Sequence, residues 1–141
     1  MKNLLVISLF FLFTNAGCTD KQDEVTQKMG DIFQLKASEA ASFSDNENSI
    51  IIKLISIQES RCPVNVQCIR VGEAIAILDL QIGDEQFKDL KVCIGCEKQM
   101  DIPESIQIKA KTKTYSLQLN SVDPYPKSTG INTPTATLVL N

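Results

Sequence analysis

Short segments in which apolar and polar residues alternate recur along this chain, and they constrain its fold more than any other feature. In "EAIAILDLQI" (73–82), every second residue from Ala74 to Ile82 is apolar. A period of two places such residues on one face of a β-strand. A turn at Gly83 to Glu85 follows, after which the alternation continues to Ile94. Residues 73–94 therefore predict a β-hairpin.

Similar segments predict further strands at 49–57, 105–110, 115–122 and 135–140. "DIFQLKASEAASF" (31–43) predicts the opening strand, and a helical turn competes with strand only in its "KASEAAS" portion. Six or seven short strands with polar turns predict an all-β fold, either a single antiparallel β-sandwich of the immunoglobulin-like type or a small barrel. Residues 32–141 have the length of one domain.

The N-terminal region has the layout of a secretory signal peptide over residues 1–17. A lysine is followed by the apolar run of "LLVISLFFLFTNAGC" (4–18), which is too short to span a bilayer. The run ends in Ala16-Gly17-Cys18, which resembles the lipobox of bacterial lipoproteins. The resemblance implies cleavage before Cys18 and attachment of diacylglycerol to its sulfur. Lipid would then anchor the protein to a bacterial membrane.

Polar residues without aromatic side chains follow, and they predict a lipidated cysteine with a flexible tether over residues 18–31. Acidic residues at the start of this segment resemble the export signals of some surface lipoproteins, and a spacer that only needs charge explains them equally well. We therefore expect a location in the cell envelope. The outer membrane is favoured, with the domain either periplasmic or exposed at the surface.

Four cysteines lie in the predicted domain, and an even number in an exported chain predicts two disulfides. Three connectivities are possible. We prefer Cys62 with Cys68, and Cys93 with Cys96, where Gly95 permits a tight turn. The alternative cross-links the two loops, which would constrain the unfolded chain more because the closed loop is longer.

The same four cysteines allow two functional interpretations. Tetrahedral zinc accepts four thiolates, but five residues separate one pair and two the other, unlike the paired spacing of zinc ribbons. The "CIGC" motif (93–96) could exchange disulfides, but in oxidoreductases the motif begins a helix, whereas here it follows a strand pattern. We therefore expect no metal and no cofactor.

Composition excludes several functional classes. The chain has no histidine, and it has 17 acidic residues against 14 basic ones. The lack of histidine removes most acid–base, triad and metal-hydrolase mechanisms, so we expect no enzyme. A nucleic-acid-binding protein would carry a basic face, whereas the lysines here are dispersed among acids. We therefore expect no nucleic-acid partner.

Two longer stretches, "ESRCPVNVQCIRVGEAIAIL" (59–78) and "YSLQLNSVDPYPKSTGI" (115–131), resemble an uncharacterised group of exported bacterial β-domain proteins that are often lipid-anchored. The shared pattern is Ser-Arg-Cys-Pro, a short loop, a second cysteine, a glycine and an alternating strand. The resemblance implies a β-rich exported domain and brings no activity. Arg70 stands where the group commonly has tryptophan, and the Cys93 and Cys96 pair lies outside the pattern.

Arg61 and Arg70 are candidate binding residues. Together they could form an exposed pair that binds an anionic group on a glycan, a lipid or a partner protein. The structural alternative is that Arg61 fixes its loop by donating hydrogen bonds to backbone carbonyls or to Glu59 or Glu73, for which its planar guanidinium is suited.

Tyr125 is the third candidate binding residue, in the proline-rich segment 123–134. That segment is either a rigid connection or a recognition loop with Tyr125 at its tip. The function that we expect is a non-enzymatic binding module, attached to a membrane by lipid and able to bind an envelope protein or glycan. The alternatives are a protease inhibitor of the immunoglobulin-like type, and a thiol-redox or zinc protein that uses the four cysteines.

Overall fold

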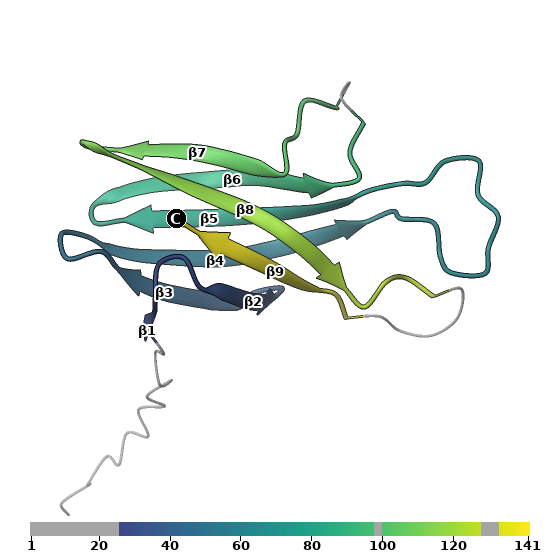
Figure 1. Cartoon of the computed structure of the whole chain (residues 1–141), viewed down its shortest axis with the longest axis horizontal. Coiled ribbons are helices and arrows are strands. Elements are labelled where there is room, and N and C mark those ends of the chain that lie inside the picture. The colour runs from purple at the N-terminus through teal and green to yellow at the C-terminus, as the bar shows by residue number, and fades with distance from the viewer. Residues whose placement is uncertain (1–25, 98–99, 128–132) are drawn as a thin grey trace, which may run out of the picture.

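The computed structural model describes residues 26–97, 100–127 and 133–141, which form β-strands and, within these ranges, no α-helix. The strands are β1 (Thr26–Gln27), β2 (Ile32–Lys36), β3 (Ala40–Ser44), β4 (Ser49–Glu59), β5 (Ala74–Ile82), β6 (Glu85–Ile94), β7 (Ser105–Ala110), β8 (Lys113–Asp123) and β9 (Thr135–Leu140). They make a five-stranded sheet in the order β1-β3-β4-β5-β6 and a four-stranded sheet in the order β2-β9-β8-β7 (Figure 1).

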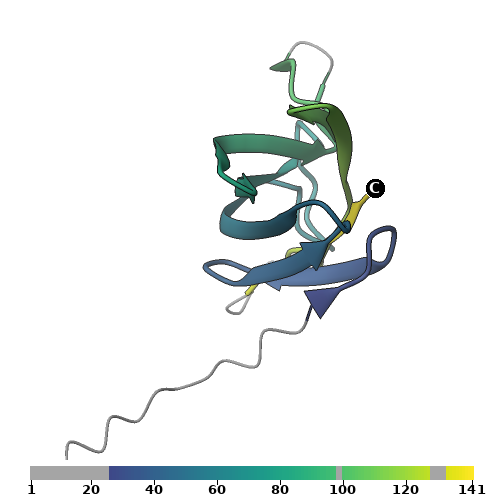
Figure 2. The same ribbon diagram turned by 90° about the vertical axis from the view of Figure 1, so that its left-hand side faces the viewer.

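One hydrophobic core is shared by the two sheets, which face each other (Figure 2). In β5, every second residue from Ala74 to Ile82 is buried, as the alternation predicts. The ring of Phe33 in β2 meets that of Phe43 in β3 edge to face, with centroids 4.8 Å apart, and so joins the sheets. The all-β prediction is confirmed. The small barrel was wrong, because two separate sheets keep free edges that a closed barrel would pair.

The beginning of the domain differs from the prediction. The single strand expected over 31–43 is two strands in different sheets, β2 and β3, joined by a turn in which Ser38 has a φ of 73°. The helical turn that competed in "KASEAAS" does not form. Before these strands, β1 pairs in parallel with β3 and Met29 packs against the core. Residues 26–31, predicted as tether, therefore belong to the folded domain.

A polar cluster joins the two sheets at the end where β4 begins. The Tyr115 hydroxyl in β8 donates a 2.5 Å hydrogen bond to Asp45 in the β3–β4 turn. Asp45 also accepts hydrogen bonds from the backbone N–H groups of Asn48 and Glu47 and from the Lys113 ammonium. The Tyr115 hydrogen bond, helped by these other donors, holds the pKa of the Asp45 carboxyl well below its usual range.

Candidate functional site

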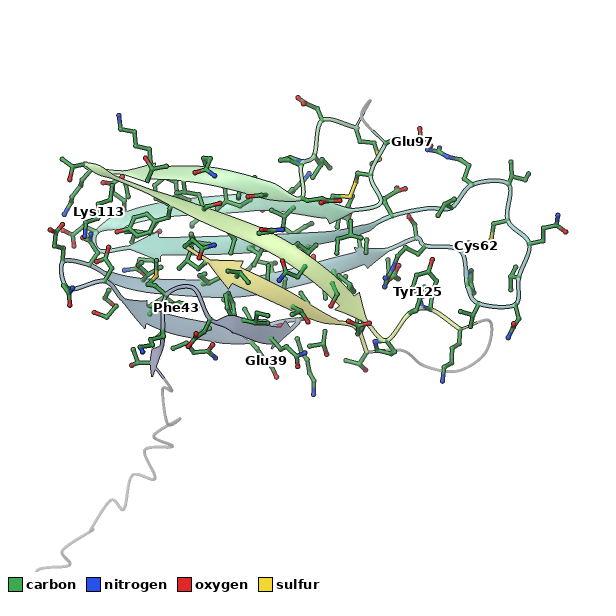
Figure 3. The ribbon with its side chains drawn as sticks, in the orientation of Figure 1. Glu39, Phe43, Cys62, Glu97, Lys113 and Tyr125 are labelled. Atoms are coloured by element: carbon green, nitrogen blue, oxygen red, sulfur yellow. A yellow bond between two sulfur atoms is a disulfide. The ribbon has the colours of Figure 1, made fainter. Side chains whose placement is uncertain are left out.

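Three connections gather at the opposite end of the sheets, which we call the loop end. They are the β4–β5 loop (60–73), the β6–β7 connection (95–104) and the β8–β9 connection (124–134), described except for 98–99 and 128–132. The β4–β5 loop extends beyond the strands (Figure 1), and Cys62, Tyr125 and Glu97 mark the three connections in Figure 3. Loops on a rigid β scaffold are common binding elements.

The β4–β5 loop has a stem held by backbone hydrogen bonds. The Ser60 N–H donates to the Glu73 carbonyl at 2.9 Å, and the Cys62 N–H donates to the Val71 carbonyl at 2.7 Å. Gly72 has a φ of +73°, and a Cβ there would overlap the carbonyl group of Ser60. Glycine is therefore required where the two sides of the stem approach each other.

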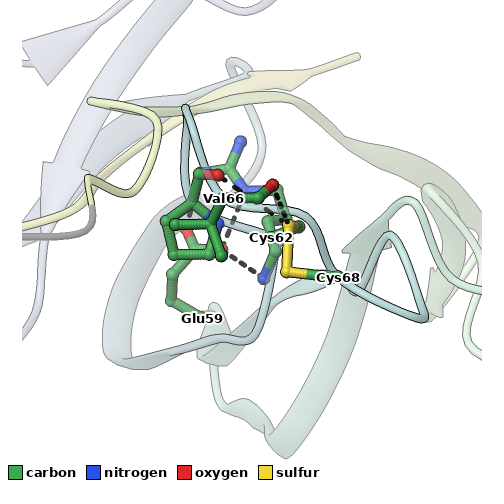
Figure 4. Close-up of a disulfide and its surroundings, with 6 residues drawn as sticks. Glu59, Cys62, Val66 and Cys68 are labelled. Atoms are coloured by element: carbon green, nitrogen blue, oxygen red, sulfur yellow. Dashed lines mark hydrogen bonds and ion pairs between the residues drawn. A yellow bond between two sulfur atoms is a disulfide. The ribbon is translucent and has the colours of Figure 1, made fainter.

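A disulfide between Cys62 and Cys68 closes the next part of the loop, with Cα atoms 5.9 Å apart (Figure 4). Inside it, the Val66 N–H donates to the Pro63 carbonyl at 3.2 Å, and Asn65 has a φ of 65°. This is a tight turn with asparagine at the left-handed position, a conformation that asparagine tolerates well. The predicted local pairing of Cys62 with Cys68 is confirmed, and the pair acts as a staple.

Arg61 is built into the base of the loop. Its guanidinium donates two hydrogen bonds to the Glu59 carboxylate and one, of 2.8 Å, to the Val122 carbonyl in β8. It also lies over the Tyr125 ring, 4.4 Å from the centroid, and its side chain is 9% exposed. The hydrogen-bonded Glu59 carboxylate raises the pKa of Arg61. Arg61 therefore makes the hydrogen bonds that its structural interpretation named, to Glu59 and to a backbone carbonyl, and its charge is neutralised and covered.

The β8–β9 connection supports the side of the β4–β5 loop. The Val64 N–H donates a 3.0 Å hydrogen bond to the Pro126 carbonyl, and Val64 forms a parallel β-bridge with Lys127. Tyr125 is half-exposed beside this contact and packs against Arg61. Its described neighbours therefore place Tyr125 at the base of the loop end, while the remaining residues 128–132 lie outside the described ranges.

Aliphatic side chains cover residues 62–71 of the β4–β5 loop, the part closed by the hydrogen bond from Cys62 to Val71, which we call the tip. Seven large hydrophobic side chains are exposed among the described residues, and five of them lie at the loop end: Val64, Val66, Ile69, Val71 and Tyr125. Ile69 is fully exposed, and Val71 is 76% exposed. A cluster of exposed apolar side chains is a candidate interaction surface. Sequence reasoning missed it, because "CIRVG" has no periodicity that shows which residues face solvent.

Arg70 lies between Ile69 and Val71 and is separate from Arg61. Its guanidinium contacts the Glu97 carboxylate of the β6–β7 connection at 3.0 Å, and the two side chains are 67% and 55% exposed. The structure does not bring Arg61 and Arg70 together as an exposed pair: Arg61 is covered and bonded to Glu59, and Arg70 pairs with Glu97. Of the two, Arg70 alone offers an accessible guanidinium.

The second disulfide joins Cys93 to Cys96, as preferred from the sequence, and Gly95 between them has a φ of 79°. Cys93 is fully buried at the end of β6. The redox interpretation required an accessible first cysteine at a helix N-terminus, and neither feature is present. The zinc interpretation required four thiolates, whereas all four sulfurs are paired. An open pocket of about 290 Å³ lies beside this disulfide and is lined by Cys96, Glu97, Asp101, Ile102, Pro103 and Glu104.

No family model, no curated protein and no solved structure matches this chain. Cys18, the predicted signal peptide and the tether before Thr26 lie outside the described residues. Within the described ranges, no helix is long and apolar enough to cross a membrane. Two disulfides are typical of proteins in an oxidising compartment outside the cytoplasm.

Proposed function

We propose that this protein is a lipid-anchored, non-enzymatic binding module of the cell envelope, an immunoglobulin-like β-sandwich that recognises a partner with its loop end. One observation carries the proposal: four aliphatic side chains are exposed on a loop that a disulfide and a neighbouring connection hold in place. Exposing these side chains to water is unfavourable. A partner that covers them gains a favourable free energy of about 25 cal/mol for each Å² of apolar surface buried.

The position of the loop end relative to the chain entry supports this role. Thr26 pairs with Ser42, next to the turn that leads into β4, whereas the β4–β5 loop begins at the far end of that strand. A strand of this length spans about 35 Å. A lipid on Cys18 lies eight residues before Thr26, a reach of about 27 Å when extended. Such an anchor would leave the loop end free to meet a partner.

The chemistry of the tip favours a protein partner over a glycan and over catalysis. Val64, Val66, Ile69 and Val71 cannot donate or accept hydrogen bonds through their side chains, and sugar hydroxyls require such bonds. An active site needs convergent polar groups in a concave pocket, whereas these side chains lie on a projecting loop. A protein surface with an apolar recess fits them best.

Site-specific photo-crosslinking tests the proposal. A photoreactive amino acid in place of Ile69, in cells that produce the full lipoprotein, is expected to give a discrete protein adduct. The same amino acid in place of Ile32, an exposed isoleucine in β2, is the matched control and should not give that adduct. The purified partner should bind the double variant Ile69→Ser, Val71→Ser at least about 10-fold more weakly than Ile32→Ser. Equal binding by both variants, or no adduct at position 69, would refute the proposed surface.

A further inference from the structure

We propose that the tip of the β4–β5 loop binds in the active-site cleft of an arginine-specific serine protease, with the Arg70 side chain in the specificity pocket. This inference rests on the proposed function and names the class of its partner. Proteases of the trypsin type carry an aspartate at the bottom of this pocket and therefore select arginine or lysine. The partner is thus concave and acidic where the tip is convex and carries a single cation.

Arg70 is free to exchange its partner. Its ion pair with Glu97 joins two side chains that are both more than half exposed, and such pairs contribute little stability. A buried aspartate can replace Glu97 and form two parallel hydrogen bonds to the guanidinium. Arg61 could not do this, because it is covered and its carboxylate partner lies at the base of the loop.

The residues beside Arg70 suit a protease cleft. Ile69 and Val71 are more exposed than any other large hydrophobic side chains among the described residues, and the chain bends at Ile69 and Arg70. Three successive side chains are therefore offered to a cleft that binds successive residues of a peptide. Arginine is also frequent among residues that dominate binding energy at protein interfaces.

The loop is fixed on both sides of this tripeptide. Cys68 precedes it and is bonded to Cys62. At the other end, the carbonyl of Val71, the last of the three residues, accepts the Cys62 N–H, and Gly72 after it packs against Ser60. Such a loop loses little conformational freedom on binding, which favours affinity. It also resists the distortion that peptide cleavage requires, so the bound peptide bond stays intact and the protein acts as an inhibitor.

Inhibition of trypsin tests the inference, with chymotrypsin for comparison and with soluble, oxidised protein beginning at Thr19. We expect inhibition of trypsin against a chromogenic peptide substrate and none of chymotrypsin. Arg70→Ala should weaken inhibition by at least about 30-fold. Arg70→Leu should shift the preference to chymotrypsin, whose pocket is hydrophobic. Lys109→Ala, which removes an exposed cation in β7 away from the loop end, is the control and should change inhibition less than about 2-fold.

The alternative outcomes each overturn the inference. The first is no inhibition at about 100 μM, a concentration far above the dissociation constant of a specific complex. The second is rapid cleavage after Arg70 without inhibition. The third is inhibition that the Arg70→Ala variant retains. If trypsin is unaffected but the crosslink at position 69 identifies another partner, only this inference fails. If neither experiment gives a result that depends on the tip, the proposed function fails as well.

Discussion

The hydrogen bond between Tyr115 and Asp45 predicts a pH-dependent loss of stability that can be measured in one variant. Tyr115→Phe removes the hydroxyl that donates to Asp45 from the other sheet, while the ring keeps its place in the core. Hydrogen bonds to charged groups contribute about 1.5–3 kcal/mol. Asp45 is 12% exposed and keeps three other donors, so we expect the lower end of this range, a loss of about 1.5 kcal/mol at pH 7.

The sign of the pH dependence follows from the lowered pKa of Asp45. A carboxyl with a pKa lower in the folded than in the unfolded state contributes stability that is fully present above its unfolded pKa of about 3.9. That contribution begins to fall when the pH drops below about 4, where the unfolded chain takes up a proton, and it is lost as the pH falls through the lowered pKa of the folded state. The difference between the wild type and Tyr115→Phe should therefore be largest at neutral pH, and it should shrink only as the pH approaches the lowered folded pKa, where folded Asp45 itself takes up a proton.

Urea unfolding of the soluble protein at pH 7 and pH 2.5 measures this difference, with an unchanged m value as the check that both proteins unfold alike. Tyr125→Phe is the matched control, because among the described residues the Tyr125 hydroxyl has no hydrogen-bond partner and its ring contact with Arg61 is retained. A neutral hydrogen bond already contributes about 0.5 kcal/mol. A loss of unfolding free energy below about 0.5 kcal/mol at pH 7 would therefore refute the reasoning. A loss that is larger at pH 2.5 than at pH 7 would refute it too, because protonation of Asp45 can only weaken this hydrogen bond.

Three further predictions concern the loop end. Arg61→Ala should lower the free energy of unfolding by about 3 kcal/mol, because it leaves Glu59 covered without its partner. Arg70→Ala should change the free energy of unfolding by less than about 0.5 kcal/mol, and chemical denaturation of both variants measures the contrast. Gly72→Ala should lower the free energy of unfolding by about 1–3 kcal/mol, because of backbone strain and overlap with the Ser60 carbonyl. Hydrogen exchange should show faster amide exchange in the stem of the loop and unchanged exchange in the core. The double variant Cys62→Ser, Cys68→Ser should lose at most about 2.4 kcal/mol, the loop-closure entropy of a short ring, and a thermal melt should still be cooperative.

Much of the fold follows from periodicity alone. The alternation in β5, β8 and β9 was recognised because one face of each strand packs in the core while the other is more polar. The failures lie where tertiary contacts override local pattern. Ser38 turns the chain between two sheets by a hydrogen bond to Leu54, which is distant in sequence. β1 has only two residues, and its parallel pairing with β3 leaves no periodic trace.

The candidate site was predictable in its position and in its cross-links, and unpredictable in its exposed surface. Loop spacing suggested the Cys62–Cys68 staple, because a short separation brings two sulfurs together in a closed turn. The roles of Arg61 and Arg70 could not be separated by sequence, since burial depends on whether Glu59 and β8 lie within reach. Ile69 was missed for a similar reason, because its neighbours determine its exposure.

The Cys62–Cys68 disulfide lies in the loop, beyond the buried residues of β4 and β5, and this position bears on what it stabilises. A cross-link between strands would reinforce the core, which already has two sheets packed around large side chains. This one closes a seven-residue ring whose other support is the contact of Val64 with the β8–β9 connection. Its removal therefore releases the tip more than it weakens the fold. If the loop end is the binding surface, opening the disulfide should reduce partner binding by more than the accompanying loss of stability accounts for.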